Sequence, residues 1–135
     1  MIAGVVLRPG VAADLPFAVN SWLRSYRIGN NANVLAKRIP HDAYYADAGF
    51  KGAIIRRLTH STLTVAVDAD DSETIYGWAC TDPDVVHYVY VKDVMRRKGI
   101  GRALCPSASV ATCITDTGRQ LLPGLKFSPY ALCVV

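Results

Sequence analysis

The sequence predicts a single α/β domain in which helices flank a mixed, mostly antiparallel sheet. The chain has 135 residues, which suits one domain with its own core. Residues 61–67 alternate with β-branched residues and predict a strand, and residues 75–81 return as a second strand after the acidic turn 68–72, as in an antiparallel hairpin. Apolar segments at 85–91 and 111–115, with a helix start between them, predict a parallel strand pair.

The first part of the chain predicts one strand and two helices. Residues 4–8 form a short strand, and Asp14 follows it at a position suited to a helix N-cap. Apolar residues at helical spacing then continue to about Arg27. Beyond an asparagine-rich loop at 29–38, a second cap at His41-Asp42 opens another helix. The residues on one side of this helix are Tyr45, Phe50, Ile54 and Leu58.

The C-terminal half is short for an α/β domain. The helix expected after Gly101 meets Pro106, which removes a hydrogen bond and clashes with the preceding turn, so this helix must be short, kinked or broken. Residues 116–123 leave room for a turn or two of helix, and 131–135 suit a last strand.

Composition argues against a membrane or secreted protein. No apolar run approaches the roughly 20 residues of a membrane span, and the N-terminus lacks the features of a signal peptide. The dispersed cysteines are expected to be reduced thiols in a cytoplasmic protein; they are Cys80, Cys105, Cys113 and Cys133. The histidines show no zinc-ligand spacing, so no metal is expected; they are His41, His60 and His87.

The stretch after the strand at 85–91 predicts an anion site. Glycines at 99 and 101 allow close backbone approach or a positive φ, and the start of a helix offers free N–H groups. Of the 15 basic residues, five gather here, and they are Lys92, Arg96, Arg97, Lys98 and Arg102. A Walker A loop is absent, and a dinucleotide fingerprint would need a third glycine where Leu104 stands.

The remaining pattern, Arg96-x-x-Gly99-x-Gly101 after a strand, resembles the acetyl-coenzyme A loop of the GNAT N-acetyltransferases. The segment 87–92 (HYVYVK), together with Pro129-Tyr130, resembles a smaller GNAT-like group of phage and bacterial genomes. The resemblance implies a central strand that splays from its parallel neighbour, with the pantetheine bonding its backbone in the gap. The coenzyme-binding residues it implies are Val89, Val91, Arg96, Arg97, Lys98, Gly99, Ile100, Gly101 and Arg102.

Candidates for acid–base chemistry are few. Asp82, Asp84 and His87 lie near the start of the central strand and are the candidate general bases, beside a water relay with no side-chain base. Members of the family with a base often carry a glutamate where this chain has Val85. The resemblance makes Tyr130 the candidate general acid for the thiolate, the alternative being a core tyrosine.

The expected function is transfer of an acetyl group from acetyl-CoA to a primary amine of a small molecule or a protein. One alternative is a catalytically weak or inactive module that binds coenzyme or protein on a GNAT scaffold. Another is a small basic nucleic-acid binder, which the local clustering of charge disfavours. A homodimer is left open.

Overall fold

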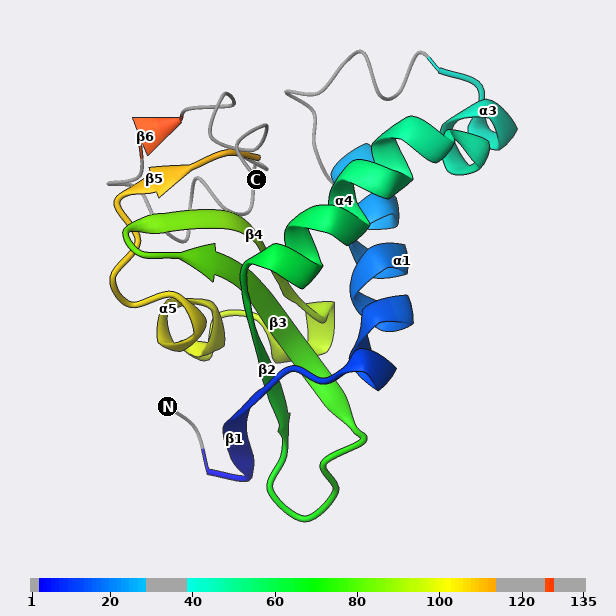
Figure 1. The fold of residues 1–135 in the computed structure, drawn as a ribbon. Coiled ribbons are helices and arrows are strands. Elements are labelled where there is room, and N and C mark those ends of the chain that lie inside the picture. Colours follow the sequence, from blue (N-terminus) through cyan, green and yellow to red (C-terminus); the bar gives the residue numbers. More distant parts are fainter. Residues whose placement is uncertain (1–2, 29–38, 114–125, 128–135) are drawn as a thin grey trace.

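A computed structural model describes residues 3–28, 39–113 and 126–127 (Figure 1). These residues form a six-stranded sheet in the order β1-β2-β3-β4-β5-β6. Its strands are Val5–Pro9, Thr62–Asp68, Ile75–Asp82, Val85–Val91, Val110–Ala111 and Lys126–Phe127. The first four pair antiparallel, and β5 lies parallel to β4. The predicted single α/β domain with a mixed sheet is confirmed, and β6 adds a second parallel pair that was not predicted.

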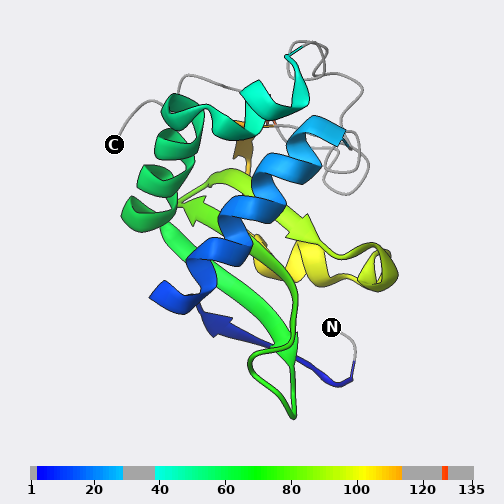
Figure 2. The same ribbon diagram turned by 90° about the vertical axis from the view of Figure 1, so that its right-hand side faces the viewer.

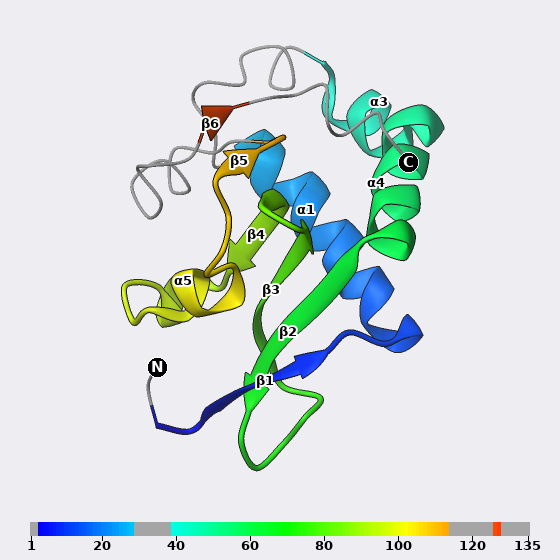
Figure 3. The same cartoon turned by 60° about the vertical axis from the view of Figure 1, so that its left-hand side comes forward.

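Helices cover both faces of this sheet (Figures 2 and 3). One face packs against α1 and α4, whereas the other packs against α5. The helices are α1 (Leu15–Ile28), α3 (His41–Ala46), α4 (Ala48–His60) and α5 (Ile100–Leu104). None of the helices in the described part of the chain is long and apolar enough to cross a membrane.

The larger core lies between the sheet and α1. Trp22 of α1 is fully buried and stacks on Tyr88 of β4, with 4.9 Å between ring centroids and 8° between planes. Trp78 of β3 lies beside both rings and donates to Ser21 Oγ at 2.8 Å. Aromatic pairs of this kind contribute about 0.5–1.5 kcal/mol each beyond the area they bury. This stack therefore fixes α1 over the middle of β4.

The start of α1 differs from the prediction, because Asp14 ends a 3-10 turn at Ala12–Asp14 and bonds the residue before that turn instead of capping α1. The helix begins at Leu15, and the buried Asp14 carboxylate accepts from the Val11 N–H at 2.8 Å. The same carboxylate accepts two bonds from the Arg8 guanidinium at 2.7 and 2.8 Å. The hydrogen bond from Arg8 holds the pKa of Asp14 below its usual value. Asp14 thus joins the helix start to β1.

The second predicted helix is in fact two. Asp47 is extended, with φ −68° and ψ 102°, and separates α3 from α4. Its carboxylate accepts from the Phe50 N–H at 2.8 Å, so this side chain competes with the helical backbone and caps α4 instead. Ile54 and Leu58 are buried on one side of α4, as the spacing predicted.

The helix after Gly101 is short, as predicted. α5 ends at Leu104, before Pro106. β5 has two residues, Val110–Ala111, and only Ala111 lies in the segment predicted as a strand at 111–115. The strand expected at 131–135 lies outside the described residues.

Candidate functional site

The candidate site lies where β4 and β5 stop pairing. The parallel register joins Val85 to Val110 and Val86 to Ala111, and the Thr112 N–H then donates to the Val86 carbonyl at 3.2 Å. β4 continues to Val91 beyond this point with no further pairing to β5. The parallel pair is therefore short, and the rest of β4 has one edge without a partner strand in the described part of the chain.

The backbone of Val89 and Val91 faces that open edge. The Lys92 N–H donates to the Tyr76 carbonyl of β3 at 2.9 Å. In an antiparallel ladder, the polar groups of alternate residues point to the same side. The N–H and C=O groups of Val89 and Val91 therefore point away from β3, as an extended ligand arm would require.

A tight loop follows β4. A 3-10 turn at Asp93–Met95 leads to Arg96, whose Nε donates to the Val91 carbonyl at 2.9 Å and whose guanidinium pairs with Asp93. Arg96 thus ties the loop back to the end of β4. The same bond engages the Val91 carbonyl, which leaves the Val91 N–H and both groups of Val89 for a ligand.

Two residues of this loop have left-handed backbone conformations. Gly99 has φ +85° and Arg97 has φ +62°. Glycine adopts such a conformation without strain, and a Cβ built at Gly99 would meet nothing within 4 Å. The space beside Gly99 is therefore open.

The same segment contains both exposed cations and buried residues. The side chains of Arg97, Lys98 and Arg102 are exposed, whereas Ile100 and Gly101 are buried. The buried residues hold the start of α5 against the sheet. Because α5 has only five residues, its dipole is small, and the cations and free N–H groups would supply most of the attraction for an anion.

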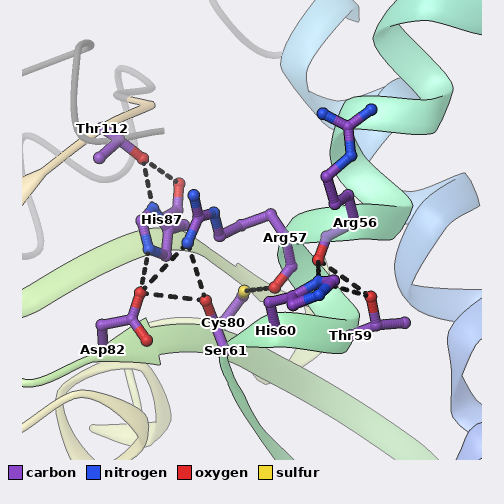
Figure 4. A network of polar contacts seen from close by, with 9 residues as sticks. All are labelled: Arg56, Arg57, Thr59, His60, Ser61, Cys80, Asp82, His87 and Thr112. Atoms are coloured by element: carbon purple, nitrogen blue, oxygen red, sulfur yellow. Dashed lines mark hydrogen bonds and ion pairs between the residues drawn. The ribbon is translucent and has the colours of Figure 1, made fainter. Parts of the chain in front are cut away.

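A buried polar network lies where β4 and β5 separate (Figure 4). His87 is 1% exposed, and its two ring nitrogens lie 2.8 Å from Asp82 Oδ2 and 3.0 Å from Thr112 Oγ1. Asp82 Oδ2 also accepts from Ser61 Oγ at 3.0 Å and lies 3.4 Å from the buried Arg57 guanidinium. The network joins the ends of α4 and β3 to β4 and to the residue after β5.

A bulge in β4 aims His87 into this network. Val86 pairs with Thr81 and Tyr88 pairs with Cys80, so His87 is an extra residue on β4. A bulge of this kind re-aims one side chain without disturbing the rest of the ladder.

The network also sets the protonation of its members. A carboxylate only accepts, so Nε2 of His87 carries a proton, and in the neutral ring Nδ1 accepts from the Thr112 hydroxyl. Burial lowers the pKa of His87; the bond to Asp82 partly offsets this, and the Arg57 charge lowers it further. Burial raises the pKa of Asp82, but the bonds from His87 and Ser61 outweigh it, and the net pKa is lowered.

The other predicted catalytic residues lie elsewhere. Asp84 is an exposed turn residue with φ +64°, and its carbonyl accepts from the Ser109 and Val110 N–H groups. Its backbone therefore fixes the start of the parallel pair. Tyr130 lies outside the described residues.

Sequence reasoning missed three members of the network. Thr112, Ser61 and Arg57 carry no motif, and only the pairing of β4 with β5 and the end of α4 bring them to Asp82. Arg57 is 4% exposed although charged, and its position on the apolar side of α4 was the available signal.

Acid should weaken the fold through His87. The unfolded imidazole binds a proton below about pH 6.5, whereas the folded one has a lowered pKa and binds it only at lower pH. The unfolded state then carries more protons, so the free energy of unfolding falls as the pH falls below that value. The slope from one such group is at most about 1.4 kcal/mol per pH unit. Urea unfolding from pH 7.5 to 5 should show this slope, and His87→Gln should flatten it. An unchanged slope in the variant would contradict the assignment.

One thiol lies at the edge of this network, where Cys80 donates to the Arg57 carbonyl (Figure 4). Cys80, Cys105 and Cys113 are free thiols in the structure, while Cys133 lies outside the described residues. Burial raises the pKa of Cys80 and Cys113 to about 12 and that of Cys105 to about 11, so these thiols are protonated at neutral pH. Within residues 3–28, 39–113 and 126–127, the His, Cys, Asp and Glu side chains form no group of three that could hold a metal ion.

The fold is that of the GNAT N-acetyltransferases. A GCN5-related N-acetyltransferase from Ralstonia eutropha matches with a TM-score of 0.58 at 16% identity, over 89% of this chain and 90% of that one. A similar protein from Rhodopseudomonas palustris matches with a TM-score of 0.56 at 16% identity, over 79% and 64% of the two chains. A third, from Kribbella flavida, gives 0.52 at 25% identity, over 76% and 61%.

The chain thus spans less than two thirds of the Rhodopseudomonas and Kribbella proteins. No protein-family model matches the sequence. A search of curated proteins finds no significant relative. The comparisons therefore establish the class of fold, and the reaction is a separate question.

Proposed function

We propose that this protein is an acetyl-CoA-dependent N-acetyltransferase that acts on a primary amine. The observation that carries the proposal is the end of β4–β5 pairing at Val86 among the described residues. The backbone groups of Val89 and Val91 point away from β3, toward this edge without a partner strand in the described residues. A pantetheine arm has the amide groups to bond such an edge as an additional strand would. The glycine loop that follows the same strand is where the attached pyrophosphate would lie.

The loop residues fit a pyrophosphate. Arg97 and Lys98 are exposed cations, and the open space beside Gly99 lets phosphate oxygens approach the backbone N–H groups. Arg96 braces the loop from behind through its bond to Val91. Coenzyme binding thus uses Val89, Val91 and the whole segment from Arg96 to Arg102, including the buried Ile100 and Gly101.

Catalysis would depend mainly on holding the two reactants together, which can contribute roughly 7–11 kcal/mol. The amine nitrogen attacks the thioester carbonyl, the C–S bond breaks, and the thiolate takes up a proton. The Val89 N–H is available for the carbonyl oxygen as charge develops. A water molecule is the simplest base, since His87 is buried with both nitrogens engaged and Asp84 lies in an exposed turn. Tyr130 is the proposed acid.

Substitution of Gly99 tests the loop. Gly99→Asn places a side chain in open space, and asparagine tolerates the left-handed conformation, so the fold should be retained. The same side chain would obstruct a phosphate group at the backbone, so affinity for acetyl-CoA should fall by roughly tenfold or more, or about 1.4 kcal/mol. Isothermal calorimetry measures the affinity, and thermal unfolding checks the fold.

Gly52→Asn is the matched control, because a Cβ at Gly52 on α4 also meets nothing within 4 Å. Its affinity should equal that of the unmodified protein. Equal affinity in Gly99→Asn would remove the loop from the coenzyme site. A protein that binds no acetyl-CoA at all would contradict the proposed function.

A second candidate is a coenzyme-binding module with little or no activity. It is favoured by Val85 at the usual glutamate position and by the burial of His87. Mass spectrometry after incubation with acetyl-CoA and a panel of amines separates the two candidates. Binding without any acetylated product would favour the module.

A further inference from the structure

The side chains of His87 and Thr112 join β4 to the residue after β5, next to the last paired residues of the described chain. The backbone ladder ends with the Thr112 N–H bonded to the Val86 carbonyl. Beyond it, His87 Nδ1 lies 3.0 Å from Thr112 Oγ1, and this hydroxyl is also 3.5 Å from the His87 carbonyl. Both residues are almost fully buried, at 1% and 2% exposure. This side-chain bond therefore extends the strand pair by one step.

His87 is itself held from the opposite side. Asp82 accepts from its Nε2, and Ser61 and Arg57 hold the same carboxylate oxygen. The imidazole ring is thus fixed between the end of α4 and Thr112, as Figure 4 shows. A ring held on both nitrogens cannot rotate without breaking a buried hydrogen bond.

We propose that Thr112 and His87 are positioning residues that fix where β4 and β5 separate and so set the gap for the pantetheine arm. The inference rests on the proposed function, because it gives the gap its occupant. Val89 lies two residues beyond His87 on β4, so a shift at the bond would move the backbone groups offered to the coenzyme. Errors of about 1 Å in such placement can cost a hundredfold in rate.

Replacing His87 by asparagine or by glutamine tests its two hydrogen bonds one at a time. An asparagine amide lies where Nδ1 lies and can accept from Thr112, whereas a glutamine amide reaches the position of Nε2 and can donate to Asp82. His87→Asn thus retains the bond between the strands, and His87→Gln loses it. Thr112→Ser keeps the hydroxyl, and Thr112→Val replaces it with a methyl group of similar volume.

Affinity for acetyl-CoA should be retained in the variants that keep the hydrogen bond between residues 87 and 112, and it should fall in the variants that lose this bond. Calorimetry should find a loss of affinity of roughly ten- to hundredfold in Thr112→Val and His87→Gln, because each leaves a buried polar group without its partner. Thr112→Ser and His87→Asn should stay within about threefold of the unmodified protein. The double variant His87→Gln/Thr112→Val should be no weaker than either single variant, because each removes the same bond.

A control variant separates the effect of the lost bond on affinity from the effect of a general loss of stability. Ile54→Val removes a buried methyl group from α4, which contributes none of the proposed coenzyme-binding residues, and serves as the destabilised control whose affinity should not change. Equal affinity in all four single variants at His87 and Thr112 would overturn the proposal. A fall in kcat in both His87 variants at unchanged affinity would also overturn it, since that result makes His87 the base.

Hydrogen exchange tests the bond without any ligand. The Thr112 amide should exchange faster in Thr112→Val and His87→Gln than in Thr112→Ser and His87→Asn, because its bond to Val86 lies at the point of separation. Equal exchange in all four would overturn the proposal. If the unmodified protein binds no acetyl-CoA, the proposed function fails while this measurement still decides whether the bond holds the strands together.

Discussion

Asp82→Ala should lower the free energy of unfolding by about 2–4 kcal/mol, because it removes the acceptor that three side chains share. Asp82 Oδ2 accepts from His87 Nε2 and Ser61 Oγ and lies 3.4 Å from the Arg57 guanidinium. His87 and Arg57 are buried, so their donor groups would lose a partner that water cannot easily replace. The loss falls short of that for a fully buried pair, since the Asp82 side chain is 36% exposed.

Chemical denaturation at pH 7.5 measures this effect. Asp82→Asn should be intermediate, because its amide oxygen still accepts a hydrogen bond but brings no charge to Arg57. Asp84→Asn is the control, since asparagine tolerates the positive φ of this exposed turn and should change stability little. A loss below about 0.5 kcal/mol for Asp82→Ala would mean that the network contributes no more than an ordinary surface group.

The sequence was sufficient to place the central strand and its loop. Val85–Val91 has the predicted bounds, because a continuous apolar run bounded by Asp-Pro-Asp and Lys-Asp leaves few alternatives. The positive φ of Gly99 agrees with the role predicted for this glycine. Local patterns of this kind need no knowledge of the distant chain.

The polar network could not be predicted in the same way. Asp82 lies in a segment that reads as an ordinary turn, and His87 alone in an apolar strand gives no partner. Their connection depends on a bulge in β4, and the bond to Thr112 depends on a crossover from β4 to β5. Asp82 and His87 are only five residues apart, but no sequence pattern marks the bulge that turns His87 toward Asp82. Thr112 is 25 residues from His87, so the spacing does not reveal that bond either.

Competition between the Asp47 side chain and the helical backbone explains why one helix was predicted where the structure has two. Residues 41–60 have the spacing of one amphipathic helix, and only the Asp47 side chain, by accepting from Phe50 N–H, divides it into α3 and α4. An aspartate inside a helical pattern is compatible with either outcome.

Tyr130→Phe should lower kcat by roughly 10²–10⁴ while affinity for acetyl-CoA stays the same. The proposal assigns Tyr130 the proton that the coenzyme thiolate takes up when the C–S bond breaks. A phenol with a pKa near 10 is a weak acid at neutral pH, but a thiolate leaving group has a similar basicity, so sharing the proton needs little driving force. His87 and Asp84 do not offer a substitute, because one is buried with both nitrogens engaged and the other lies in an exposed turn.

Steady-state kinetics with the best acceptor, beside calorimetry with acetyl-CoA, measures this effect. Tyr76→Phe is the matched control, because the Tyr76 hydroxyl donates to Asp68 in the β2–β3 hairpin at 2.8 Å and should leave kcat unchanged. An unchanged kcat in Tyr130→Phe would return Tyr130 to a packing role. If rate, affinity and stability all declined together, the hydroxyl would be supporting the fold and not the leaving group, since a transition-state role lowers kcat alone.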